Sequence, residues 1–193
     1  MSDASSVGGA LGRAIELDGQ DDAIAIENPL TGDSPHTLSA WVRQEETGDN
    51  DALLVLGTGD CTRARWLHTR YDQDTVAFGF FCDDMPDSAV NLEDAGWKLL
   101  HWTYADGEST LFVDGEQAGP SFAHGGAPDT QGGGGFIGNV PASAGFGADM
   151  GLHGAVDEVR ISRRARSPAW IAAEFANQSA PSSFLAVGPE QPL

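Results

Sequence analysis

The chain has 193 residues, with 29 Asp or Glu against 10 Lys or Arg, and a formal net charge of −19. This length suits one domain with a full hydrophobic core. The acidic balance argues against nucleic acid as a partner, because phosphate backbones need a basic surface. No run of about 20 apolar residues is present, so the sequence predicts no membrane span.

Stretches with strand periodicity follow one another along the chain, separated by turns rich in Gly, Asp and Pro. One short helix is expected over 168–176, with Ser167 as its N-cap and Pro168 in its first turn. The pattern predicts an all-β fold, a two-sheet antiparallel β-sandwich of jelly-roll type with one short C-terminal helix. In chain order, the expected strands are 14–17, 23–26, 37–43, 52–56, 65–71, 75–81, 97–104, 109–113, 116–119, 135–138, 154–162 and 183–187.

The expected sandwich occupies residues 14–188, between a flexible N-terminal segment, 1–13, and a tail, 189–193. The N-terminal residues lack the basic and apolar regions of a signal peptide. Either a signal peptide has been removed, or this is a domain of a longer chain; we expect a domain that is part of a larger secreted protein. The loop 139–150 is long and rich in small residues, which often marks a binding rim.

Lys98 is the only lysine of this acidic chain. An acidic, lysine-poor surface stays soluble where salt screens its self-repulsion, which predicts a halophilic source. A GC-rich genome, in which Arg displaces Lys, is the alternative. Neither interpretation says what the protein binds.

Cys61 and Cys82 flank an expected hairpin whose turn is 72–74. Folding about this turn brings the two sulfur atoms together, which predicts a disulfide worth on the order of 3 kcal/mol. A disulfide favours an extracellular location. Two free buried thiols are the alternative.

The segment 154–162 predicts a strand in which Asp157 points the same way as Val159 and Ile161, with Glu158 and Arg160 on the other face. A buried, ionised carboxylate needs a partner, and a hard cation such as Ca²⁺ would supply one. The alternative is a carboxylate that caps backbone amides at the sheet edge.

Four segments, taken together and in order, carry a resemblance to a known family: 17–22, 37–42, 97–104 with 111–115, and 156–162. With them, the chain resembles the laminin-G-like, concanavalin A-like lectin/glucanase superfamily. The resemblance implies a curved two-sheet sandwich with a structural Ca²⁺. It implies Asp157 as one ligand, joined by Asp18, the Gly19 carbonyl and Asp21.

Glycosidases of this superfamily carry two catalytic carboxylates on one strand, and a retaining mechanism needs the two groups about 5 Å apart. The sequence shows no such strand: Glu93 and Asp94 lie in an expected loop, and Asp157 and Glu158 point to opposite faces. We therefore expect no enzyme, with a glycoside hydrolase-like activity as the less favoured possibility.

Sugar binding usually needs an aromatic ring with polar groups beside it. Trp66, Arg65, His68 and Arg70 are the expected ligand-binding residues, because the family pattern constrains this part of the chain least. The predicted function is a non-catalytic, extracellular or cell-surface module that binds a polysaccharide or a glycoprotein glycan. The alternative is an adhesive or spacer domain, which would contact other surface proteins.

Overall fold

The computed structural model describes residues 4–46, 50–70, 75–85, 88–130, 133–146 and 150–184, and these form two antiparallel β-sheets. The larger sheet has the order β1-β2-β14-β4-β9-β10-β11, with β12 beside β10, and the smaller has the order β3-β13-β5-β6-β7-β8. The expected all-β sandwich is confirmed. The strands are β1 (Ser5–Gly8), β2 (Arg13–Asp18), β3 (Ile24–Glu27), β4 (His36–Glu46), β5 (Ala52–Gly57), β6 (Ala64–Arg70), β7 (Thr75–Phe80), β8 (Asp83–Asp84), β9 (Lys98–Ala105), β10 (Glu108–Val113), β11 (Glu116–Gln117), β12 (Phe122–Ala123), β13 (Gly134–Ile137) and β14 (His153–Ser162).

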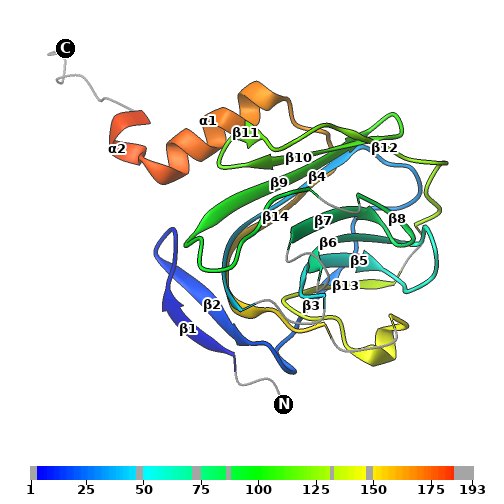
Figure 1. Ribbon diagram of the computed structural model, residues 1–193, viewed down its shortest axis with the longest axis horizontal. Helices are drawn as coiled ribbons and strands as arrows, with labels where there is room; N and C mark the ends of the chain where they lie inside the picture. The colour runs from blue at the N-terminus through cyan, green and yellow to red at the C-terminus, as the bar shows by residue number, and fades with distance from the viewer. Residues whose placement is uncertain are drawn as a thin grey trace, which may run out of the picture.

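The core lies between the two sheets, where alternate residues of each strand meet. Leu54, Leu67 and Phe78 from the smaller sheet pack with Leu100 and Trp102 from the larger sheet, all fully buried. Figure 1 shows the long strands of the larger sheet bending around the smaller one. This arrangement leaves each sheet with an outer face that is free to carry other elements.

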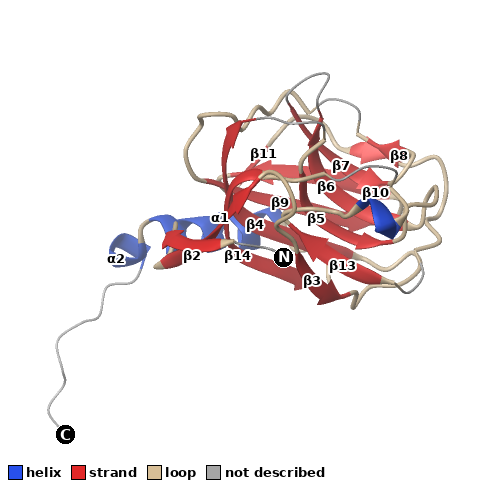
Figure 2. Cartoon of the chain, turned by 90° about the horizontal axis from the view of Figure 1, so that it is seen from below, coloured by secondary structure: helices blue, strands red, loops and turns tan. Residues whose placement is uncertain are grey.

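Helix α1 (Pro168–Ser179) covers part of the outer face of the larger sheet, as Figures 1 and 2 show. Its N-cap is Ser167, whose hydroxyl accepts a hydrogen bond from the Trp170 amide, as the sequence predicted. Two polar contacts hold the helix on the sheet: His101 Nε2 lies 2.7 Å from Glu174, and Trp41 Nε1 donates to Gln178 over 2.5 Å. A 3₁₀ turn, η1 (Ala142–Ala144), and a second short helix, α2 (Pro181–Phe184), complete the described elements.

Two expectations about the chain ends need correction. Strand β1 pairs with β2, so Ser5–Gly8 is not a flexible arm. The expected strand 183–187 is wrong at its start, because α2 occupies Pro181–Phe184; its other residues lie outside the described ranges. A proline fixes φ near the helical value and suits the first position of a helix, which outweighs the strand preference of this short run. Within the described residues, no helix is long and apolar enough to cross a membrane.

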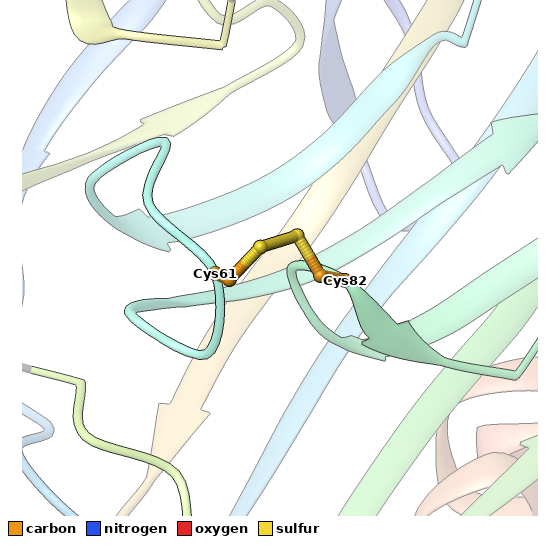
Figure 3. The surroundings of a disulfide bond; sticks show 2 residues. All are labelled: Cys61 and Cys82. Atoms are coloured by element: carbon orange, nitrogen blue, oxygen red, sulfur yellow. A yellow bond between two sulfur atoms is a disulfide. The ribbon is translucent and has the colours of Figure 1, made fainter.

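Cys61 and Cys82 form a disulfide, which confirms the predicted pair. Figure 3 shows it joining the turn between β5 and β6 to the turn after β7. The bond therefore ties together two hairpins of the smaller sheet.

Removing this disulfide is expected to lower the free energy of unfolding by about 3 kcal/mol. The bond closes a loop with a sequence separation of 21, and loss of the link restores that much chain entropy to the unfolded state. Urea unfolding of Cys61→Ser/Cys82→Ser, beside the parent protein, measures the change. A difference below about 1 kcal/mol would contradict this estimate.

Candidate functional site

Strand β6 divides the predicted ligand-binding residues between two faces of the smaller sheet. Its side chains alternate, so Arg65 and Leu67 point into the core while Trp66, His68 and Arg70 point to the outer face. Three of the four predicted residues therefore lie together. The fourth, Arg65, is not at the surface and cannot contact a ligand on that face.

Arg65 instead belongs to a buried polar cluster between the sheets. Its side chain is 0% exposed; it donates to the Gly32 carbonyl over 2.6 Å and to the Thr130 hydroxyl. Burial lowers its pKa to about 10, so the guanidinium stays charged at neutral pH. Beside it, His36 Nδ1 lies 2.9 Å from the Ser34 carbonyl, and its ring packs 4.8 Å from Trp102.

The buried histidines predict that acid destabilises the fold. Burial, with the nearby Arg65 charge, lowers the pKa of His36 to about 3. Burial also lowers the pKa of His124. The unfolded chain takes up these protons near pH 6.5, so stability is full above that pH and falls as the pH drops towards 3.

At pH 5 we expect His36 alone to lower the free energy of unfolding by about 2 kcal/mol relative to its value above pH 6.5, because each pH unit below that value contributes about 1.36 kcal/mol. Urea unfolding between pH 4.5 and 7.5 measures the slope. The variant His36→Asn keeps an amide that can reach the Ser34 carbonyl but does not titrate, so its slope is expected to be smaller. An unchanged slope would show that His36 does not carry the effect.

On the outer face, Trp66 and His68 stack on each other and an acidic strand edge approaches them. Their ring centroids lie 3.7 Å apart with an interplanar angle of 25°. Trp66 lies opposite Gly79 of β7, where φ is +146° and an added Cβ would come within 2.6 Å of Asp84 Cα. Glycine at this position therefore lets β8 approach. Asp84 Oδ2 then lies 3.5 Å from His68 Nε2 and 3.8 Å from Arg70.

Three buried polar atoms of this face have no hydrogen-bond partner in the described part of the chain: Trp66 Nε1, His68 Nε2 and Asp84 Oδ2. His68 Nε2 and Asp84 Oδ2 lie at ion-pair distance from each other, whereas a buried donor such as Trp66 Nε1 costs about 1–3 kcal/mol if it stays unsatisfied. Buried polar groups in proteins nearly always have partners, so a cluster of exceptions needs an explanation such as a ligand or ordered water. We call these three residues with Arg70 the β6–β8 site.

The described part of the loop 139–150, which the sequence marked as a binding rim, lies against the Trp66 end of this site. Phe146 packs 6.3 Å from the Trp66 ring, and Val140 and Met150 belong to the same apolar cluster. Trp66 is consequently only 8% exposed. The other end is more open, because the side chains of Arg70 and Asp84 are 28% and 13% exposed.

Asp157 does not occupy the position expected of it. A β-bulge between Asp157 and Arg160 adds one residue to β14 relative to β4, with Glu158 at φ +50°. The bulge shifts the alternation, so Asp157 no longer shares a face with Val159, which packs on the core. Its Oδ2 accepts a hydrogen bond of 2.8 Å from the Leu11 amide, a contact of the kind that the alternative interpretation expected.

The N-terminal acidic turn gathers a different set of carboxylates. Asp18, Asp21 and Asp22 each place an oxygen within 4.8 Å of the others. Asp157 is not part of this group: Asp18 pairs with His153 of β14, and Asp157 lies four residues further along that strand. The Gly19 carbonyl packs against Gly151: a Cβ added to Gly151 would lie 2.5 Å from the carbonyl oxygen of Gly19. Asp22, which the sequence analysis did not select, is the buried member, at 2% exposed.

Asp84 was also missed by the sequence analysis. Its position depends on β8 folding back across Gly79, and the pair Asp83-Asp84 follows the cysteine of an expected hairpin without any spacing that marks a site. In the hairpin register expected from the turn 72–74, Gly79 lies opposite Leu67, so the sequence did not mark it as the residue facing Trp66; the observed register is shifted by one residue. With these residues in place, the face offers an aromatic ring, an imidazole, a guanidinium and a carboxylate.

Two antiparallel sheets packed face to face in this order define a jelly-roll β-sandwich. The family model described as "Concanavalin A-like lectin/glucanases superfamily" matches residues 18–172, and the chain belongs to this family. The resemblance inferred from the sequence is confirmed. No curated protein sequence matches the chain significantly.

Solved structures share the fold at low identity. Domain 4 of AbnA, an extracellular GH43 arabinanase of Geobacillus stearothermophilus in complex with arabinotriose, matches with 18% identity and a TM-score of 0.70, over 91% of this chain and 82% of that one. The binding domain of Paraclostridial Mosquitocidal Protein 1 matches with 13% identity and a TM-score of 0.69, over 90% and 45%. Trypanosoma rangeli sialidase matches with 18% identity and a TM-score of 0.65, over 92% and 28%. The chain thus spans less than half of the last two proteins.

Proposed function

We propose that this domain is a non-catalytic carbohydrate-binding module that binds a neutral polysaccharide or glycoprotein glycan at the β6–β8 site. The observation that carries the proposal is the cluster of polar atoms on Trp66, His68 and Asp84 that make no hydrogen bond among the described residues, although His68 and Asp84 lie at ion-pair distance, beside an aromatic ring. Sugar hydroxyls both donate and accept hydrogen bonds, so one sugar residue can satisfy all three atoms. The net charge of −19 favours a neutral glycan at a site that contains a carboxylate.

The relatives support this proposal. The arabinanase domain was solved with arabinotriose, and a protein of Bacteroides ovatus with the same fold is described as a putative carbohydrate binding protein. The disulfide supports a secreted or cell-surface location. We propose that the domain acts there as part of a larger protein.

Binding to a polysaccharide panel tests the function, with arabinan and arabinotriose as the first probes. The assay is run in molar salt, because a halophilic source is part of the proposal, once with Ca²⁺ and once with EDTA. Retention on at least one neutral glycan without release of reducing sugar supports a binding module. Release of sugar would favour a hydrolase instead.

A second candidate, an adhesive or spacer domain that contacts other surface proteins, is favoured by one observation. Trp66 is only 8% exposed, whereas glycan-stacking rings are usually open to solvent. A domain that binds no glycan in either condition of the panel, yet is fully folded, would support this alternative.

We also propose a structural Ca²⁺ at the acidic turn, held by Asp18, Asp21 and Asp22. Ca²⁺ lies 2.3–2.6 Å from its oxygen ligands, so carboxylate oxygens within 4.8 Å of one another can share one ion. The turn is linked to the loop beside Trp66: Asn139 donates to the Gln20 carbonyl over 2.9 Å and accepts from the Met150 amide over 2.8 Å. The ion would brace the turn and, through Asn139, the loop.

Calcium at 100 times its dissociation constant is expected to stabilise the fold by about 2.7 kcal/mol, because it binds only the folded turn. Thermal unfolding at increasing CaCl₂ measures this effect. Asp22→Asn is expected to lose the response, whereas Asp157→Asn, the matched control, is expected to keep it. A response that disappears in Asp157→Asn but persists in Asp22→Asn would contradict this assignment.

A further inference from the structure

A groove lies on the outer face of the larger sheet, whereas the β6–β8 site is on the smaller sheet. It has a volume of about 1120 Å³ and runs between helix α1 and the outer face of β14 and β4, the region where Figures 1 and 2 show the helix leaving the sheet. We call it the α1 groove. Its lining includes Ser39, Arg160, Arg163, Arg166, Trp170 and Asn177.

The α1 groove concentrates positive charge on an acidic chain. Four of the ten basic residues of the sequence lie between positions 160 and 166, and three of them line the groove. Arg160 is paired with Glu158 and Glu174. For Arg163 and Arg164, no acidic partner lies within ion-pair distance in the described ranges of the chain, although 29 acidic residues are available in the sequence. The β-bulge places Arg160 on this outer face, so the bulge also shapes the groove.

An exposed aromatic ring lies beside these charges. Trp170 is 39% exposed and Phe184, at the far end of the groove, is 47% exposed; both are among the few large apolar side chains that the described residues leave open to solvent. The Arg166 guanidinium lies 4.3 Å over the Trp170 ring, and its buried Nε has no hydrogen-bond partner among the described residues. The guanidinium thus stacks on the ring and lines the groove, and Arg166 is partly exposed.

We propose that the α1 groove binds an acidic sugar, a glycan residue that carries a carboxylate or a sulfate. Arginine is the side chain best suited to these planar or tetrahedral anions, because its donors form paired, charge-assisted hydrogen bonds. An acidic pyranose combines such an anion with an apolar ring face that can pack on Trp170. The rest of the surface, with a net charge of −19, repels long polyanions, so the groove selects a short acidic unit.

This inference does not rest on the β6–β8 site. The two sites lie on different sheets, share no residues and call for sugars of different charge. A chain with both sites could bind one glycan at two places, holding a neutral sugar at the β6–β8 site and an acidic sugar in the α1 groove.

Calorimetric titration with trigalacturonate, at 50 mM NaCl and neutral pH, tests the proposal. The double variant Arg163→Gln/Arg166→Gln is expected to bind at least about 100-fold more weakly, since each charge-assisted contact contributes on the order of 10-fold. Trp170→Ala is expected to lose about 10-fold. Arg13→Gln, which removes an arginine of β2 outside the groove, is the matched control and is expected to bind like the parent. The single variant Arg163→Gln changes an exposed side chain and keeps the test valid if the double variant unfolds.

Three further probes separate an acidic sugar from simpler ligands. The methyl ester of trigalacturonate removes the charge and is expected not to bind. Inorganic sulfate and acetate carry the charge without a sugar ring, and are expected to bind at least 10-fold more weakly. Equal affinity for the ester, for sulfate or acetate, or for the double variant would overturn the proposal. These variants are expected to bind neutral glycans like the parent protein. A negative result for the α1 groove therefore does not bear on the β6–β8 site, which has its own test.

Discussion

Replacing Arg65 with alanine is expected to lower the free energy of unfolding by about 3–5 kcal/mol, without a direct effect on glycan binding. The side chain is fully buried and donates to the Gly32 carbonyl and the Thr130 hydroxyl. Its loss leaves both acceptors without this donor and opens a cavity beside Phe80, whose ring lies 5.6 Å from the guanidinium.

The variant Arg65→Met separates the two causes. Methionine fills most of the cavity but donates no hydrogen bond, so we expect about half of the loss seen for alanine. Urea unfolding of both variants, together with glycan affinity of the folded Met variant, measures the outcome. A stable Arg65→Ala with weakened glycan binding would restore Arg65 as a ligand residue and contradict its placement in the core.

The double variant His68→Ala/Asp84→Ala is expected to weaken neutral-glycan binding by about 150-fold or more. Hydrogen bonds that involve charged groups contribute about 1.5–3 kcal/mol each, and the two variants remove two groups that face the proposed sugar. The double variant also removes the buried His68 ring, which stacks on Trp66, and the ion-pair contacts of Asp84, so its thermal unfolding is compared with that of the parent protein. Asp60→Ala, which changes an exposed carboxylate outside the site, serves as the control.

Isothermal titration of each variant with the best glycan of the panel measures the affinity, and thermal unfolding verifies the fold. Normal affinity in the double variant would remove the β6–β8 site from consideration. Lost affinity in Asp60→Ala as well would indicate a general charge effect instead of direct contacts.

The strands could be predicted because their apolar residues alternate or run together locally. Ala52–Leu56 and the strand around Trp102 are examples, and the observed β5 and β9 begin within a residue of the expected positions. The disulfide could be predicted for the same reason, since one hairpin brings both cysteines together.

Asp157 and Arg65 show why the sites were harder to predict. The bulge in β14 depends on pairing with β4, a strand more than 100 residues earlier, and a shift of one residue moves a side chain to the other face. Arg65 follows simple alternation with Leu67, but its partners Gly32 and Thr130 come from distant loops that no local pattern announces. A charged residue was therefore assigned to the surface, where such residues usually lie.

Glycan binding at the β6–β8 site is tested most directly by following the indole N–H proton of Trp66 by NMR during titration with the best neutral glycan of the panel. Trp66→Phe assigns the signal among the five tryptophans. We predict a saturable shift of the Trp66 indole resonance as a sugar oxygen accepts its hydrogen bond, while the indole of Trp102, already bonded to Ser109, stays constant. A bound glycan that leaves the Trp66 resonance unmoved would contradict the β6–β8 site as the place of binding.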